Sequence, residues 1–150
     1  NLIARQSHIS TLRANHLVTP HPGEMARLLP GGNEPSNRAA IAREFTSRSE
    51  ATLLFKGTRT IVTNRSSPLA YNTTGTPGMA TGGQGDVLSG LLAALMARGF
   101  EPLEAAKTGS WLCGCASELA LSRQSEESLS ATTTANYIGS AFKKLRSTPI

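Results

Sequence analysis

The chain has 150 residues, of which 39% are hydrophobic, 17% charged and 5% aromatic, and its net charge is +5. This size and composition predict one soluble globular domain, and no apolar run approaches the roughly 18 residues of a transmembrane helix, so we expect no membrane partner. The scattered basic residues and few aromatic residues argue against nucleic acid and favour attraction of phosphorylated small molecules. Residues 1–10 lack the basic start and apolar run of a secretory signal, which favours a cytoplasmic protein.

The first part of the chain predicts a short strand followed by two helices. Residues 1–6, NLIARQ, resemble the interior of a helix. Residues 16–20 read as a strand that ends at a proline, and Pro22 suits the first turn of a helix that continues to residue 29. Residues 29–37 form a loop by composition.

Ser36 or Asn37 can cap the next helix, over residues 38–49. Its apolar residues at helical spacing are Ala40, Ile41 and Phe45.

Three strands are expected next. The first covers residues 52–55, Lys56 and Gly57 form a turn, and residues 60–63 return as its partner. Tyr71 begins another short strand. Strands that alternate with helices predict an α/β domain with a mostly parallel sheet.

Residues 72–90, NTTGTPGMATGGQGDVLSG, place several glycines around one acidic residue, Asp86, before a run that predicts a buried helix over residues 87–97, stopped by Gly99. Glycines let a ligand approach the main chain, and a helix start directs free N–H groups at an anion such as phosphate. Asp86 would lie beside that anion as a base. Alternatively, the segment is a flexible loop, with Asp86 as the N-cap of its own helix; both roles can coexist.

The last part of the chain predicts two helices. Pro102 starts a helix that reaches residue 122 and whose apolar positions cover more than one face. A polar loop over residues 122–128 follows, and Thr133 or Thr134 can open the final helix. Cys113 and Cys115 have no further cysteine or nearby histidine to complete a metal set, so we expect two free thiols on a buried helix. His8 and His16 are interpreted as structural.

Three stretches of the chain carry a resemblance to a known family. They are the glycine-rich segment, TPHPGEMARLL over residues 19–29, and LLFKGTRTIV over residues 53–62. Together, in this order, they resemble the ADP- or ATP-dependent NAD(P)H-hydrate dehydratases of the ribokinase-like superfamily, over nearly the whole chain. The resemblance implies a ribokinase-like three-layer α/β domain of which residues 1–150 are the C-terminal portion.

The activity that this resemblance implies is dehydration of the S-epimer of hydrated NADH or NADPH, with ADP or ATP as co-substrate and Mg²⁺ bridging the phosphates. ADP is favoured, because the motifs are similar to bacterial-type sequences. The family also implies a homo-oligomer, with a tetramer favoured, and residues upstream of this chain that touch the substrate, so activity can require that missing half.

The resemblance assigns roles residue by residue. Asp86 is the catalytic base and contacts the substrate, and His21, held rigidly between two prolines, contacts the hydrated dinucleotide. Glu24 would orient His21, hold water around Mg²⁺, or favour the start of its own helix. No protein ligand to a metal is expected. The residues expected to hold the nucleotide are Lys56, Gly57, Thr58, Arg59, Thr60, Gly83, Gln84 and Gly85.

The chain departs from the family pattern at Thr76, where an asparagine is usual, and at Cys113, where a histidine is frequent. Two other functions stay open. One is a ribokinase-like kinase of a vitamin-precursor alcohol, which would use the same loop and aspartate but release a stable phosphoester. The other is a non-catalytic fragment that only binds nucleotide or assembles with a partner.

Overall fold

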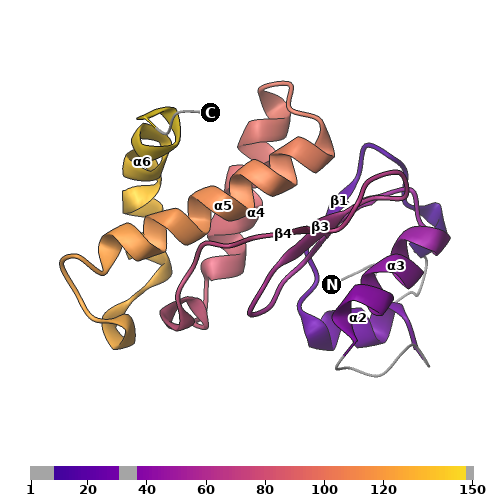
Figure 1. Cartoon of the computed structure of the whole chain (residues 1–150), viewed down its shortest axis with the longest axis horizontal. Coiled ribbons are helices and arrows are strands. Elements are labelled where there is room, and N and C mark those ends of the chain that lie inside the picture. Colours follow the sequence, from indigo (N-terminus) through magenta and orange to yellow (C-terminus); the bar gives the residue numbers. More distant parts are fainter. Residues whose placement is uncertain (1–8, 31–36, 148–150) are drawn as a thin grey trace. The chain divides into compact units, whose positions relative to one another are not determined.

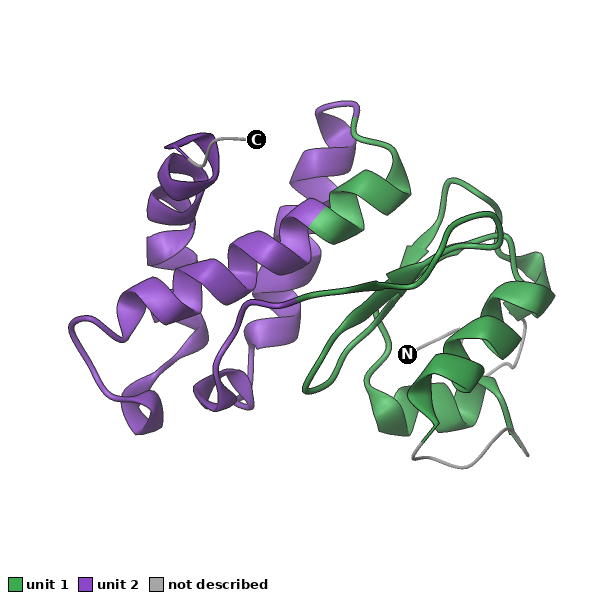
Figure 2. Cartoon of the chain, viewed as in Figure 1, with its two compact units in different colours: residues 1–72, 100–107 green, residues 73–99, 108–150 purple. Residues whose placement is uncertain are grey.

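The computed structural model describes residues 9–30 and 37–147 (Figure 1). The helix expected at residues 1–6, most of the loop at 29–37, the capping candidate Ser36 and His8 lie outside the described residues. The chain divides into two compact units (Figure 2), residues 1–72 with 100–107, and residues 73–99 with 108–150. We call them unit 1 and unit 2 and describe each by itself.

Unit 1 contains a four-stranded sheet in the order β1-β2-β3-β4. Its strands are β1 (Leu17–Val18), β2 (Thr52–Phe55), β3 (Ile61–Thr63) and β4 (Ala70–Tyr71). β1 and β2 pair in parallel, but β2–β3 and β3–β4 are antiparallel. The expectation of a mostly parallel sheet is therefore wrong for these strands. The links between β2, β3 and β4 are too short for the crossover of roughly a dozen residues that a parallel pair requires.

The predicted strands of unit 1 need two smaller corrections. The turn expected at Lys56 and Gly57 is a longer loop over residues 56–60, because β3 begins only at Ile61. Tyr71 ends β4 instead of beginning a strand. It pairs with Ile61 across the ladder, and its side chain is 48% exposed.

Two helices of unit 1 lie on one side of its sheet (Figure 1). They are α2 (Pro22–Leu28) and α3 (Arg38–Arg48), preceded by the short η1 (Ile9–Thr11). Pro22 opens α2 as expected, and the Asn37 side chain caps α3 by accepting a hydrogen bond of 3.0 Å from the Ala40 N–H. Phe45 is fully buried, whereas Ile41 packs against the core only in part. The buried core of unit 1 is Ile9, Leu12, Met25, Leu28, Leu29, Ala42, Phe45, Ala51, Leu53, Phe55 and Ile61.

Unit 2 is built mainly from helices. They are α4 (Gln84–Ala97), α5 (Pro102–Ala120), whose first residues belong to unit 1, α6 (Ala131–Ser147), and the short η2 (Pro77–Met79) and η3 (Glu126–Ser128). Residues 112–117 of α5 are all buried, which confirms an apolar helix with more than one covered face. Leu112, Cys115, Ala116 and Ala141 form the α5–α6 core. None of the described helices has the length and apolar character needed to cross a bilayer.

Two expectations for unit 2 are wrong. The first is that α4 is a buried helix: it buries Leu88, Leu92 and Leu95 but exposes Ala93 and Ala94. The prediction failed because an apolar composition does not reveal which face of a helix has a neighbour.

The final helix begins at Ala131, earlier than Thr133 or Thr134. Ser130 precedes it and accepts the Thr133 N–H at 3.1 Å, so the serine performs the capping role. Thr134 is instead fully buried.

The segment before the glycine cluster is held closely against α5 and η3. The Thr74 hydroxyl donates to the Trp111 carbonyl at 3.0 Å, and the Gly75 N–H donates to Glu118 Oε1 at 2.7 Å. The Thr76 hydroxyl donates to the Glu126 carboxylate. At Gly114 on α5, an added Cβ would lie 2.6 Å from the Thr74 carbonyl carbon. Gly114 therefore allows the segment to approach the helix.

Gly114→Ala should destabilise the protein by about 1–3 kcal/mol, because the new methyl group meets backbone that cannot rotate away. Gly139→Ala in α6 is the matched control: nothing lies within 4 Å of its added Cβ, so better helix propensity should stabilise the protein by up to about 1 kcal/mol. Urea unfolding measures both changes. Equal stability of the Gly114→Ala variant and the wild type would contradict the close approach.

Candidate functional site

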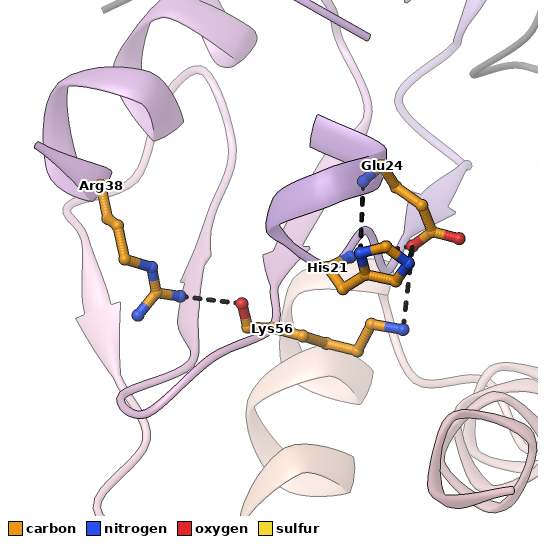
Figure 3. Close-up of polar contacts among 4 residues, drawn as sticks. All are labelled: His21, Glu24, Arg38 and Lys56. Atoms are coloured by element: carbon orange, nitrogen blue, oxygen red, sulfur yellow. Dashed lines mark hydrogen bonds and ion pairs between the residues drawn. The ribbon is translucent and has the colours of Figure 1, made fainter. Parts of the chain in front are cut away.

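The parallel pairing of β1 and β2 brings the chain segments that follow these strands to the same edge of the sheet. The pair is in register at Val18 and Leu53, and the Lys56 N–H extends the contact by donating to the Pro20 carbonyl at 2.9 Å. His21 comes shortly after β1 and Lys56 directly after β2. Their side chains therefore lie near each other, together with Glu24 (Figure 3). This strand edge is where α/β sheets commonly bind ligands.

His21 begins α2 through a reciprocal pair of hydrogen bonds. The Glu24 N–H donates to His21 Nδ1 at 3.2 Å, and the His21 N–H donates to Glu24 Oε2 at 2.9 Å. This is a capping box in which the imidazole replaces the usual hydroxyl. The flanking prolines predicted a rigid turn at His21, and the structure adds that the histidine's own side chain contributes to that rigidity.

The cap determines which imidazole nitrogen carries the proton. Because Nδ1 accepts a hydrogen bond, the neutral ring must be protonated at Nε2. Nε2 lies 3.6 Å from Glu24 Oε2, and the His21 side chain is 51% exposed. The ring thus presents an N–H donor at a partly open position, with Glu24 beside it.

Glu24 links His21 to Lys56. Its Oε2 lies 3.9 Å from Lys56 Nζ, and the Glu24 side chain is only 17% exposed. Burial alone would raise the pKa of the Glu24 carboxyl. The hydrogen bond from the His21 backbone and the nearby positive charge of Lys56 act against burial, and the pKa lies below its usual value. Of the roles foreseen for Glu24, the structure contains the helix-start and His21-orienting contacts.

The loop over residues 56–60 contains the first group of expected nucleotide contacts. Lys56 and Thr60 are half-buried, whereas Thr58 and Arg59 are exposed. The Thr60 hydroxyl donates to the Gly57 carbonyl at 3.5 Å. Gly57 has a φ of +153°, a conformation that disfavours other residues.

Arg38 holds this loop from the first residue of α3, and no sequence motif identified it. Its guanidinium donates to the carbonyl oxygens of Phe55, Lys56 and Arg59, each at 3.0 Å. Burial lowers the pKa of Arg38 below its ordinary value. One sequence signal was available: a basic residue is unfavourable in the first turn of a helix, so an arginine there suggests partners outside the helix.

In unit 2, the glycine-rich segment leads into α4 as expected, but the helix begins at Gln84 and not at Val87, because the turn at Gly83 already starts it. Gly83 is the N-cap residue, with a φ of +86° in the left-handed region. The first helical hydrogen bond runs from the Asp86 N–H to the Gly83 carbonyl at 3.0 Å. The N–H groups of Gln84 and Gly85 precede that bond and have no partner within the helix. An anion at the helix start can therefore be held by main-chain donors.

Asp86 lies in the first turn of α4 and is exposed. The alternative that Asp86 caps its own helix is wrong, because Gly83 occupies the N-cap position without a side-chain hydrogen bond. The positive end of the helix dipole favours a carboxylate at this position. Its oxygens remain accessible to a ligand that binds at the helix start.

The Gln84 side chain is directed into unit 2. Its Nε2 donates to the Thr134 hydroxyl at 3.0 Å, and that hydroxyl lies 3.0 Å from the Ser117 hydroxyl. Ser117 in turn donates to the Cys113 carbonyl at 3.0 Å. Gln84 Oε1 is buried without a hydrogen-bond partner among the described residues. Gln84 therefore anchors α4 with its side chain and offers a ligand only its main chain.

Cys113 and Cys115 are free and buried, as expected. Burial raises the pKa of the Cys113 thiol to about 11, so this thiol is neutral and a poor nucleophile near pH 7. His16 accepts the Arg13 N–H at its Nδ1, 3.0 Å away, which agrees with a structural role. Within residues 9–30 and 37–147, no three His, Cys, Asp or Glu side chains are grouped to hold a metal ion.

The expected site residues thus form two groups, one in each unit. Unit 1 brings together His21, Glu24 and Lys56. Unit 2 brings together the main chain of residues 83–85 and the carboxylate of Asp86.

Comparison with known proteins gives consistent matches. A family model described as NAD(P)H-hydrate dehydratase matches residues 1–140. The chain is 36% identical over 148 residues to the bifunctional NAD(P)H-hydrate repair enzyme Nnr of Moorella thermoacetica, which covers 97% of this chain and 28% of that protein. It is 38% identical over 107 residues to the ADP-dependent (S)-NAD(P)H-hydrate dehydratase of Neisseria meningitidis serogroup B, covering 70% of this chain and 36% of that protein.

Solved structures have the same fold. The ADP/ATP-dependent NAD(P)H-hydrate dehydratase of Bacillus subtilis, co-crystallized with ATP/Mg²⁺, superposes with a TM-score of 0.79 at 27% identity, covering 85% of this chain and 47% of that one. A ribokinase-like superfamily protein of Enterococcus faecalis superposes with a TM-score of 0.78 at 26% identity, covering 95% and 49%. The expected ribokinase-like α/β fold is confirmed. The chain spans between a quarter and two fifths of these curated relatives and about half of these solved structures.

The lowered pKa of Glu24 predicts a specific loss of stability in acid. A carboxyl whose pKa is lower in the folded state stabilises the protein above its unfolded pKa of about 4.3, and this contribution is lost as the pH falls through the folded value. Glu24→Gln keeps an oxygen acceptor but removes the charge. The variant should therefore have a lower free energy of unfolding than the wild type. This difference should be largest near neutral pH and should shrink below about pH 4. Urea unfolding at several pH values measures it, with Glu50→Gln on the exposed surface as control; a deficit independent of pH would contradict the assignment.

Proposed function

The chain belongs to the NAD(P)H-hydrate dehydratase family, and on that premise we propose that its protein dehydrates the S-epimer of hydrated NADH or NADPH at the expense of ADP or ATP. The reaction would return damaged dinucleotide to its reduced form. Because the chain spans only part of its relatives, we also propose that it is the C-terminal portion of one longer domain. The exposed Ala93 and Ala94 on α4 support this, since a further layer would cover them.

The start of α4 is the observation that carries the proposal. Gly83 turns the chain, the N–H groups of Gln84 and Gly85 face outward from the helix start, and Asp86 stands exposed in the first turn. A terminal phosphate held by such donors is positioned, and part of its negative charge is neutralised. Asp86 is then the base that accepts the proton of the hydrated ring's hydroxyl.

The proposed reaction has two steps, phosphorylation of the hydrate and elimination of phosphate. The hydroxyl oxygen of the hydrate attacks the terminal phosphorus of the nucleotide, Asp86 accepts the hydroxyl proton, and the shortened nucleotide leaves. The phosphorylated oxygen then departs as inorganic phosphate with loss of a ring proton, which restores the double bond of NADH or NADPH. Phosphorylation lowers the barrier to elimination, because phosphate is a much better leaving group than hydroxide.

The groups in unit 1 fit the two substrates. In our proposal, Lys56 and the loop through Thr60 hold the nucleotide with an ammonium, hydroxyls and main-chain groups. His21 contacts the hydrated dinucleotide through the Nε2–H of its partly exposed ring, and Glu24 keeps the ring oriented. These roles follow the matching motifs of the family, and the shared strand edge of His21 and Lys56 supports them.

Mg²⁺ would be carried by the nucleotide instead of by a protein cage. The described residues contain no cluster of three potential metal ligands, and Mg²⁺ often binds substrate phosphates while keeping several waters. When bound, it supplies positive charge to the phosphates. The similar protein of Bacillus subtilis was co-crystallized with ATP/Mg²⁺, which supports an adenine nucleotide with Mg²⁺ as the co-substrate here.

Three finer parts of the proposal concern the preferred nucleotide, the oligomeric state and the cellular location. We favour ADP, because the similar protein of Neisseria meningitidis is named ADP-dependent. We also propose a homo-oligomer, with a tetramer as first expectation, and a cytoplasmic location, where reduced dinucleotides are used.

The full-length protein that contains this chain should restore the absorbance of reduced dinucleotide when given hydrated NADH or NADPH, Mg²⁺ and ADP or ATP. Inorganic phosphate should appear in equal amount. An unchanged hydrate with both nucleotides would remove the proposal. A stable phosphoester of a vitamin-precursor alcohol would favour a small-molecule kinase, and nucleotide binding without any turnover would favour a non-catalytic role.

Asp86→Asn should lower kcat by about 10²–10⁴-fold, because the amide cannot accept the hydroxyl proton. Nucleotide affinity should change little, since main-chain donors hold the phosphate. Glu104→Gln is the matched control, because Glu104 is likewise an exposed carboxylate in the first turn of a helix, α5. Full turnover by Asp86→Asn would show that another group accepts the proton.

A further inference from the structure

The loop over residues 56–60 has little internal support for a segment that would grip a nucleotide. Its internal side-chain contact, from the Thr60 hydroxyl to the Gly57 carbonyl, is long at 3.5 Å. Gly57 adds conformational freedom, and residues 57–59 are exposed. The conformation of such a loop must be stabilised from elsewhere, since an unrestrained loop loses entropy when it binds a ligand.

Arg38 supplies that support from α3. Its NH2 group donates to the carbonyl oxygens of Phe55 and Lys56, and its NH1 group donates to the carbonyl oxygen of Arg59, all at 3.0 Å. One guanidinium thus joins the last residue of β2 to both sides of the loop. Figure 3 shows its hydrogen bond to the Lys56 carbonyl. A planar group with several fixed donors can do this, whereas an ammonium cannot bridge the same three oxygens in one plane.

The packing around the guanidinium is equally specific. Its central carbon lies 4.7 Å from the centre of the Phe55 ring, a favourable cation–π distance. On the loop side, a Cβ added to Gly57 would lie 2.7 Å from that carbon and from NH2. The guanidinium therefore occupies the space that any side chain at residue 57 would need. Gly57 and Arg38 form one fitted pair.

These contacts also have an electrostatic consequence. Carbonyl oxygens that pointed toward a bound phosphate would repel it. The carbonyl oxygens of Phe55, Lys56 and Arg59 instead accept hydrogen bonds from the positively charged guanidinium. They therefore point away from a ligand that binds on the opposite side of the loop. The same arrangement keeps Lys56 at the strand edge, with its ammonium 3.9 Å from Glu24.

We propose that Arg38 is the positioning residue of the nucleotide-binding loop: it does not touch the nucleotide, but it holds residues 56–60 in the conformation that binds a nucleoside diphosphate or triphosphate. This inference rests on the proposed function, because it takes the loop as the nucleotide contact. It adds a residue that lies outside all three sequence motifs.

The experiment measures ADP binding by calorimetry on the full-length protein with Arg38→Ala and Arg38→Lys. Loss of three charge-assisted hydrogen bonds should weaken ADP binding roughly tenfold or more in Arg38→Ala. Arg38→Lys should recover little of it, because the geometry and not the charge is required. KM for ADP should rise in parallel, while KM for the hydrate stays within about twofold.

Arg43→Ala is the matched control. Arg43 lies on the same helix and donates to a single exposed carbonyl, that of Ser67, at 3.0 Å. Its loss should leave ADP affinity within about twofold. Methylguanidinium added to Arg38→Ala should restore part of the ADP affinity by occupying the vacated space, and methylammonium should not. A merely structural loss of stability would not show this selectivity.

A double-mutant cycle with Gly57→Ala tests the fitted pair directly. Gly57→Ala should weaken ADP binding in the wild type, because its methyl group displaces the guanidinium, and should cost less in an Arg38→Ala background. Additive effects would overturn the pairing. Unchanged ADP affinity in both Arg38 variants would overturn the inference alone, whereas failure of the wild type to bind ADP would overturn it together with the proposed function.

Discussion

The parallel pairing of β1 with β2 is the constraint on which the site in unit 1 depends. Parallel strands end at the same edge of a sheet, so the segments after Val18 and Phe55 emerge side by side although they are far apart in the sequence. The hydrogen bond from the Lys56 N–H to the Pro20 carbonyl continues this pairing into the loops. His21, Glu24 and Lys56 meet for that reason. An antiparallel arrangement would have sent the two segments to opposite edges.

Unit 2 uses its side chains differently. Thr74, Thr76 and Gln84 all direct their polar groups at α5, α6 or η3, which holds the glycine-rich segment in place. What remains for a ligand is the main chain at the start of α4 and the carboxylate of Asp86. This division accounts for the composition of the segment: threonines and a glutamine anchor it, glycines let its backbone turn and approach its neighbours, and one acidic residue is left exposed.

Sequence patterns predicted local features well where one residue determines them. Pro22 opens α2, and Asn37, one of the two expected candidates, caps α3. Errors arose where the answer depends on a neighbour. Thr133 and Thr134 are both plausible caps by residue type, but Ser130 lies at the correct distance from the first turn of α6. The apolar residues of α4 indicated a buried helix, although composition cannot specify which face is covered.

The sequence by itself determined the family, the starts of α2 and α3 and the residues with the appropriate chemistry, because motifs and caps depend on neighbours a few positions away in the chain. Only the tertiary structure decided the mixed sheet, the link from His21 through Glu24 to Lys56, and the role of Arg38. The last of these joins α3 to a loop about 20 residues later. Such contacts depend on how separate elements pack against each other, and a single amino-acid sequence does not specify that packing directly.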